Sequence, residues 1–358
     1  MSKAPPITRR DTLTGLAASL LRPAPASASP LSLRAAAARA GITFGASISA
    51  GMKADYARLY IEEVAIATTD TALKFSALRP DSKSFRFAQA DEILAFCQSH
   101  NIALRGHTLI WNEDLPPWLH AQTPAQIARS FDEHIEKTVS HFAGRLHSWD
   151  VVNEPFWPGH GLPGDYRNGP WYAALGPGYI ARAFKRVHEI DKGVRLVLNE
   201  AHCQTQNGWG QAIRPALIRL VDELLDAGIP LHAVGLESHL VPQWGFDVAV
   251  YQRFMEDLAK RPIEIYLTEM DVNDASFPND IATGDQKVAQ LYRTYLDAAL
   301  KIPKVTLLET WQLSDAYSWY RGTDAAKARA MRPLPYDAQL RAKPARDAIL
   351  AALKSRRH

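Results

Sequence analysis

Cysteine, net charge and basic clusters are all scarce in this chain. Its only two cysteines are Cys97 and Cys203, so a scaffold held together by several disulfide bonds is excluded. We expect both to be free, mostly buried thiols. The formal net charge is only +3 over 358 residues, and basic side chains gather only in the short C-terminal tail 354–357. A nucleic-acid partner is therefore not expected, because such proteins carry a basic surface.

No hydrophobic run is long enough to span a bilayer as a mature helix. The N-terminal apolar stretch Leu13–Leu21 is short, follows the twin arginines Arg9 and Arg10, and precedes the small residues 26–28. This order is typical of a secretory signal. We interpret residues 1–30 as a twin-arginine-like export signal and linker, which predicts a periplasmic or extracellular protein without membrane contact after cleavage. The alternative is an N-terminal arm with no targeting role.

Two motifs that would indicate other enzyme classes are also missing. No Gly-rich phosphate turn follows an early strand, as a doubly wound nucleotide-binding sheet would require. No paired His-x-His pattern lies at a strand end, as expected for a metal-dependent barrel hydrolase. We therefore expect neither a metal nor a cofactor.

What the chain does contain is a regular alternation of β-rich runs and amphipathic helical patterns from residue 41 onward. Strands separated by helices must run parallel, because a parallel return needs a crossover. Eight such units predict a (β/α)8 TIM barrel, in which residues 31–358 form a single catalytic domain. A final helix is expected over Asp337–Leu353. The eight runs are Ile42–Ser47, Val64–Thr68, Ile102–Thr108, His147–Val152, Val194–Asn199, Leu231–Glu237, Ile263–Met270 and Val305–Trp311.

Two glutamates stand directly at the ends of apolar strands. Glu154 ends the fourth run before Pro155, which cannot continue a central strand, and Glu269 ends the seventh. Paired carboxylates at the mouth of a barrel are what a retaining glycosidase requires, one as nucleophile and one as acid and then base. We predict Glu269 as nucleophile and Glu154 as acid/base, with His239 bonding Glu269 and Asp271 orienting that histidine. The alternative is that both glutamates form salt bridges at the rim.

Several motifs, in barrel order, resemble glycoside hydrolase family 10, the retaining endo-β-1,4-xylanases. The resemblance covers about residues 41–350. It implies internal hydrolysis of β-1,4-linked xylan without a cofactor, and we expect a monomer. The motifs are Arg105–Trp111 with Leu115–Leu119, Trp149–Glu154, Val234–Leu240, Leu267–Val272 and Ser314–Trp319.

The resemblance also implies roles for residues around the two glutamates. Asn153 would bind the 2-hydroxyl of the sugar being cleaved, an interaction that strengthens in the transition state. Trp311 and Trp319 would wall the pocket and stack on sugar faces. Other members of the sugar site would be Lys74, His107, Trp111 and Glu237. The alternatives are core packing for Trp111, a solvated position for Lys74 and a buried structural histidine for His107.

The chain departs from the family's pattern at positions expected to border the sugar subsites. Thr71 stands where the family usually has asparagine, Asn112 replaces a histidine, and Glu237 replaces a glutamine and so adds a charge near His239. Glu200 and Gln312 also differ. These changes keep two alternatives open: an exported glycanase acting on another β-linked polysaccharide, such as a β-glucan or exopolysaccharide, and a non-catalytic carbohydrate-binding barrel.

Overall fold

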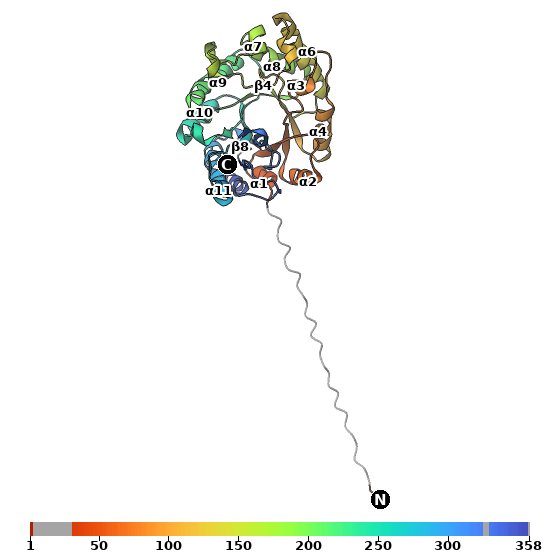
Figure 1. The fold of residues 1–358 in the computed structure, drawn as a ribbon, viewed down its shortest axis with the longest axis vertical. Coiled ribbons are helices and arrows are strands. Elements are labelled where there is room, and N and C mark those ends of the chain that lie inside the picture. Colours follow the sequence, from red (N-terminus) through yellow and green to blue (C-terminus); the bar gives the residue numbers. More distant parts are fainter. Residues whose placement is uncertain (3–30, 325–328, 357–358) are drawn as a thin grey trace. The chain divides into compact units, whose positions relative to one another are not determined.

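The computed structural model describes residues 1–2, 31–324 and 329–356, so the predicted export segment lies almost entirely outside the described residues. Eight parallel strands form a closed barrel (Figure 1), in the order β6-β5-β4-β3-β2-β1-β9-β8, with β6 pairing to β8. The predicted (β/α)8 barrel is confirmed. The barrel strands are β1 Thr43–Ile48, β2 Ile66–Thr69, β3 Ala103–Gly106, β4 Ser148–Asn153, β5 Arg195–Glu200, β6 Ala233–Leu236, β8 Glu264–Val272 and β9 Val305–Thr310.

A ring of helices surrounds the strands (Figure 1), which explains why the strands are apolar almost throughout. All six residues of β4 are buried, as expected for a parallel sheet covered by helices. The helices are α1 Leu33–Arg39, α2 Ala54–Glu63, α3 Phe75–Leu78, α4 Ala88–Ser99, α5 Pro117–His120, α6 Pro124–Phe142, α7 Pro170–Leu175, α8 Tyr179–Ile190, α9 Gly208–Asp226, α10 Val248–Leu258, α11 Ile281–Ala299 and α13 Pro344–Ser355.

Local sequence signals explain where helix α6 begins. Thr123 caps α6 by accepting a hydrogen bond from the Gln126 amide, and the Gln126 side chain accepts from the Thr123 amide. Pro124 occupies the first helical turn, where no hydrogen bond is lost. The buried residues of α6, including Ile127, Phe131 and Ile135, recur at helical spacing and face the barrel.

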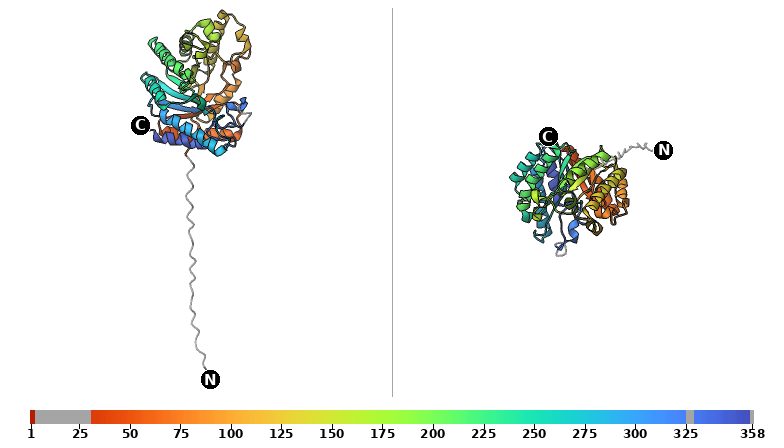
Figure 2. Two further views of the ribbon diagram at one scale, coloured as in Figure 1. Left: turned by 60° about the vertical axis from the view of Figure 1, so that its left-hand side comes forward. Right: turned by 90° about the horizontal axis from the view of Figure 1, so that it is seen from above.

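The predicted closing helix over Asp337–Leu353 is wrong at its start, since α13 begins only at Pro344. The Asp337 carboxylate accepts hydrogen bonds from the backbone amides of Gln339 and Arg341, both at 2.9 Å, and so holds the preceding segment in a turn. Side-chain bonding of this kind competes with helix formation. Helix α13 packs against α11 and α1 (Figure 2).

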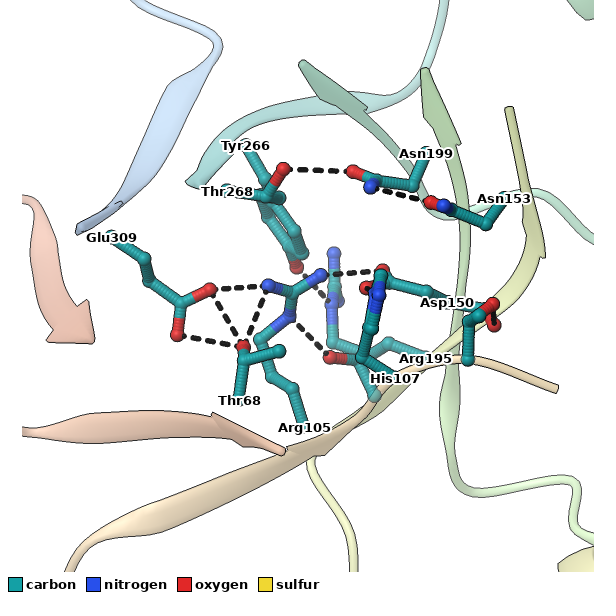
Figure 3. A network of polar contacts seen from close by, with 12 residues as sticks. Thr68, Arg105, His107, Asp150, Asn153, Arg195, Asn199, Tyr266, Thr268 and Glu309 are labelled. Carbon is teal, nitrogen blue, oxygen red and sulfur yellow. Dashed lines mark hydrogen bonds and ion pairs between the residues drawn. The ribbon is translucent and has the colours of Figure 1, made fainter. Parts of the chain in front are cut away.

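A buried charged cluster, rather than an all-apolar packing, fills part of the barrel interior (Figure 3). Arg105 on β3 is fully buried and pairs with Asp150 on β4 at 2.5 Å and with Glu309 on β9. Thr68 on β2 donates a hydrogen bond to Glu309. The cluster ties four strands together directly beneath the carboxyl ends of the strands.

Cys97 and Cys203 are both buried and free, as expected. Among the described helices, none combines the length and the apolar character that crossing a membrane requires.

Candidate active site

A cleft of about 490 Å³ opens at the carboxyl ends of the strands, where barrel enzymes place their chemistry. Ten of the eleven predicted site residues line it, and the eleventh, Asp271, lies behind His239. The ten are Lys74, His107, Trp111, Asn153, Glu154, Glu237, His239, Glu269, Trp311 and Trp319.

Glu154 follows β4 and is bound by an arginine from the irregular segment beyond it. Its backbone adopts a left-handed conformation with φ of 45°, which is uncommon for a residue with a side chain. Arg167 donates from Nε to the Glu154 carbonyl oxygen at 2.8 Å and from Nη2 to the Glu154 carboxylate. Arg167 also pairs with Glu113 and lies over the Trp157 ring at 4.3 Å. These contacts fix the direction of the Glu154 side chain into the cleft.

Glu269 lies within β8 and is held from two sides. Asn199, at the end of β5, donates from Nδ2 to Glu269 Oε1 at 2.9 Å, and His239 Nε2 lies 3.4 Å from Glu269 Oε2. The other ring nitrogen of His239 bonds Asp271 Oδ1 at 2.8 Å, and Trp319 donates from Nε1 to Asp271 Oδ2 at 2.7 Å. The predicted chain from Glu269 through His239 to Asp271 is therefore present.

The surroundings shift the pKa of the two glutamates in opposite directions. Burial raises the pKa of Glu154; the Arg167 guanidinium and a hydrogen bond with the Glu237 carboxyl oppose this shift, and the charges of Glu113 and Glu269 add to it. Burial alone would also raise the pKa of Glu269, but His107, His239 and Lys74 outweigh it and lower the pKa to about 2. One carboxyl therefore favours the protonated form and the other the ionised form, which is the division that acid and nucleophile need.

The remaining predicted residues surround these carboxylates. Asn153 Oδ1 accepts from Asn199 Nδ2 at 2.7 Å (Figure 3). His107 Nδ1 lies 3.0 Å from Asp150 Oδ2, so the charged cluster in the barrel interior orients a cleft residue. The Lys74 ammonium lies 5.2 Å from the centre of the Trp111 ring and 5.9 Å from that of Trp311, within cation–π range.

Not all of the departures from the family pattern border the cleft as expected. Thr71 and Glu237 line it. Asn112, by contrast, accepts from the Trp171 amide at 3.1 Å, Glu200 accepts from the Phe156 amide at 3.2 Å, and Gln312 donates to Asp70 at 3.0 Å. These three side chains are buried among protein groups. The expectation was wrong for them because a strand-end position does not reveal whether a side chain turns into the cleft or behind it.

Sequence reasoning missed two groups of residues, one behind Glu154 and one lining the cleft. Arg167 belongs to an irregular segment without periodicity, so nothing in the sequence connects it to Glu154. The second group is aromatic: Trp157 packs edge-on against Trp209 at 4.0 Å between ring centres, and His202 packs against Trp244 at 5.1 Å. Trp157, His202 and Trp244 line the cleft. Their signal was the high tryptophan content, nine residues in all.

One group in the described part of the chain has the composition of a metal site. Glu237, His239 and Glu269 each offer a ligand atom, and these atoms lie within 4.8 Å of one another.

The sequence matches the model of glycosyl hydrolase family 10 over residues 32–352. The chain belongs to glycosyl hydrolase family 10. Its membership identifies the protein as a glycoside hydrolase, so the expected enzyme class is confirmed.

Curated relatives in family 10 share somewhat more than a quarter of the aligned residues. Endo-1,4-beta-xylanase B of Thermotoga neapolitana is 28% identical over 271 residues, which cover 75% of each chain. Beta-1,4-xylanase of Dictyoglomus thermophilum is 29% identical over 290 residues, covering 77% of this chain and 79% of that protein.

Solved structures agree with this assignment. Xylanase 10B from Thermotoga petrophila RKU-1, in complex with xylobiose, superimposes with a TM-score of 0.81 at 28% identity and covers 91% of this chain and 98% of its own. Native xylanase 10B from Thermotoga maritima gives a TM-score of 0.80 at 28% identity and covers 90% and 98% of the two chains.

Proposed function

We propose that this family 10 enzyme is an endo-1,4-β-xylanase that hydrolyses internal linkages of xylan with retention of anomeric configuration. The observation that carries the proposal is the pair of glutamates facing one cleft, with the pKa of Glu154 raised and that of Glu269 lowered. A retaining mechanism needs this difference between its two carboxyl groups. The similarity to xylanases supports xylan as the substrate.

In the first step the ionised Glu269 attacks the anomeric carbon while Glu154 donates its proton to the departing glycosidic oxygen. His239 and Asn199 hold the Glu269 carboxylate in place through its two oxygens. Asn153, which accepts a hydrogen bond from Asn199, would bond the sugar's 2-hydroxyl in this mechanism.

In the second step Glu154, now ionised, removes a proton from water, which attacks the same carbon and releases Glu269. Each of the two steps inverts the configuration at the anomeric carbon, so the overall reaction retains it. Arg167 serves both steps, because it holds Glu154 in position and stabilises the ionised form that the second step requires.

The binding of a polymer is supported by the aromatic side chains that line the cleft together with the two glutamates. Trp111 and Trp311 lie near Lys74, Trp319 lies near His239, and Trp157 and Trp244 also line the cleft. Flat aromatic faces of this kind suit stacking on sugar rings along an extended chain. A second substrate, another β-linked polysaccharide, is favoured by Thr71 and Glu237, which line the cleft where the resemblance implies asparagine and glutamine.

The deciding experiment is digestion of β-1,4-xylohexaose, with the products followed by chromatography and their anomeric configuration by NMR. Internal cleavage that first yields the β-anomer supports the proposal. Cleavage of β-glucan or an exopolysaccharide with no action on xylo-oligomers would contradict xylan as substrate. Initial release of the α-anomer would contradict the assignment of Glu269 as nucleophile.

We also propose that residues 1–30 direct export of a monomeric enzyme, with residues 31–358 as its catalytic domain. The support is the order of twin arginines, apolar stretch and small residues. Replacing Arg9 and Arg10 by lysine should leave the enzyme inside the cell. Unchanged export of that variant would contradict the proposal.

A further inference from the structure

We propose that Glu237, His239 and Glu269 form a binding site for a transition-metal dication of the Zn²⁺ class, and that an ion bound there blocks hydrolysis by occupying the nucleophile. This goes beyond the proposed function, because hydrolysis by two carboxyl groups uses no metal. The metal would be a regulator or inhibitor of the enzyme. Only the inhibition rests on the proposed function, whereas the binding itself does not.

The three ligand atoms already lie near the spacing of a tetrahedral metal site. His239 Nε2 is 3.4 Å from Glu269 Oε2 and 3.9 Å from Glu237 Oε2. Two ligands of one tetrahedral zinc ion, each about 2.1 Å from the metal, are about 3.4 Å apart. The pair formed by His239 and Glu269 fits without movement, and Glu237 must approach the other two ligands, since the three atoms lie within 4.8 Å of one another. A fourth position stays open toward the cleft.

The surrounding hydrogen bonds leave the right atoms free to bind a metal. The Asn199 amide nitrogen donates to Oε1 of Glu269 at 2.9 Å and to Oε1 of Glu237 at 3.4 Å. In each carboxylate the other oxygen, Oε2, is therefore the one that faces His239. Asp271 bonds the far ring nitrogen, Nδ1, at 2.8 Å and leaves Nε2 for a ligand. A carboxylate behind a histidine in this way is the usual support of a metal-binding imidazole.

Glu237 is a buried carboxyl in contact with another carboxyl. It is only 4% exposed, its carboxyl group shares a hydrogen bond with that of Glu154, and its Oε2 atom lies 3.9 Å from His239 Nε2. A buried carboxylate is costly to ionise without a counter-charge. A bound dication would supply that counter-charge.

Protons compete with a metal ion for these ligand atoms. Burial lowers the pKa of His239, but Asp271 and Glu269 outweigh it and raise the pKa to about 10. Burial and the charges of Glu269, Glu154 and Glu200 raise the pKa of Glu237. A metal must displace the His239 proton, so binding should strengthen as the pH rises.

Other charged groups around the site modulate this effect. Lys74 and His107 face Glu269 and oppose a second cation. The carboxyl of Glu154 faces Glu237 and favours the binding of a cation, while Arg167 neutralises part of the Glu154 charge.

The test is titration of the complete protein with ZnCl2 in a calorimeter, in a buffer that does not bind zinc, at about pH 6 and about pH 8. We expect one ion per chain, tighter binding at the higher pH and proton release. Glu237→Gln keeps the shape of the side chain but removes one ligand, and should weaken binding at least about tenfold. His239→Asn should abolish this binding event. Glu256→Gln, an exposed carboxylate on α10, is the matched control and should bind zinc as the parent does.

The parent, Glu237→Gln and control proteins are compared by circular dichroism, so that lost binding is not mistaken for lost folding. On a substrate that the parent cleaves, Zn²⁺ should raise KM with little change in kcat, and less so in Glu237→Gln. Binding of equal strength in the parent and Glu237→Gln would overturn the proposal, as would no binding at millimolar zinc. If the parent cleaves no xylan, the proposed function fails while the calorimetric comparison still decides the metal site.

Discussion

Arg167 binds both the backbone and the side chain of Glu154: its Nε donates to the Glu154 carbonyl oxygen at 2.8 Å and its Nη2 donates to the Glu154 carboxylate. One guanidinium thus fixes the left-handed backbone of Glu154 and the direction of its side chain. Because the same cation favours ionised Glu154, it sets a limit on how far burial can raise that pKa. Arg167 is a positioning residue in the proposed mechanism.

Replacing Arg167 by methionine should move the alkaline limb of the pH profile to higher pH. Without the cation the pKa of Glu154 rises further, so the proposed acid stays protonated over a wider range. We also expect kcat to fall about tenfold or more, because the second step needs ionised Glu154. The measurement is kcat and kcat/KM as functions of pH. Arg167→Lys, which keeps a positive charge, should show a smaller shift, and an alkaline limb that stays in place in Arg167→Met would contradict the role given to Arg167.

The two glutamates should differ in how their variants respond to a better leaving group. Glu154→Ala should lower kcat on xylan about 10²- to 10⁴-fold but should retain much of its kcat/KM on an aryl xyloside, because Glu269 can still form the glycosyl-enzyme. Azide should accelerate the slow second step and yield a β-glycosyl azide. Glu269→Ala should lose activity on both substrates by several orders of magnitude. Near-normal turnover of xylan by either variant would remove that residue's assignment.

Trp244 should contribute to polymer binding through its exposed ring. It is 37% exposed and lines the cleft. Trp244→Ala should raise KM for xylan about two- to tenfold with little change in kcat, since a stacked aromatic contributes about 0.5–1.5 kcal/mol. Trp244→Phe should retain most of the affinity. Equal KM values for the parent and Trp244→Ala would show that this ring does not contact the substrate.

Arg105→Met should destabilise the barrel by about 3–5 kcal/mol, because the buried carboxylates Asp150 and Glu309 would lose the cation that they share. Burial raises the pKa of Glu309 to about 7, despite the opposing effect of Arg105. As the pH falls from about 8 to about 5, Glu309 takes up its proton at a higher pH in the folded protein than in the unfolded chain. Lowering the pH should therefore recover part of the lost free energy of unfolding. Denaturant unfolding at the two pH values measures this.

The control is Arg182→Met, which breaks an exposed pair with Asp132 on α6. Exposed ion pairs contribute about 0–1 kcal/mol, so this variant should unfold almost as the parent does. If Arg105→Met were no less stable than the control, the interior cluster would not be needed for stability.

The amino-acid sequence by itself determined the barrel and the identity of its two central glutamates. Apolar strands alternating with amphipathic helices leave few alternatives to a closed parallel sheet. In such a sheet, the residue type at each strand end indicates what faces the mouth. Glu154 and Glu269 were found in this way because each directly ends an apolar run, and the order of the motifs indicated the family that the comparison then showed.

Only the tertiary structure decided which groups the side chains at those strand ends contact. Arg167 reaches Glu154 from an irregular segment, where no periodicity constrains position. Asn199 and Glu200 are adjacent in sequence, yet one bonds Glu269 and the other turns behind the cleft to the Phe156 amide. The convergence of Glu237, His239 and Glu269 likewise depends on how the ends of β6 and β8 lie side by side. Contacts between distant segments depend on packing in three dimensions, which local sequence patterns do not encode.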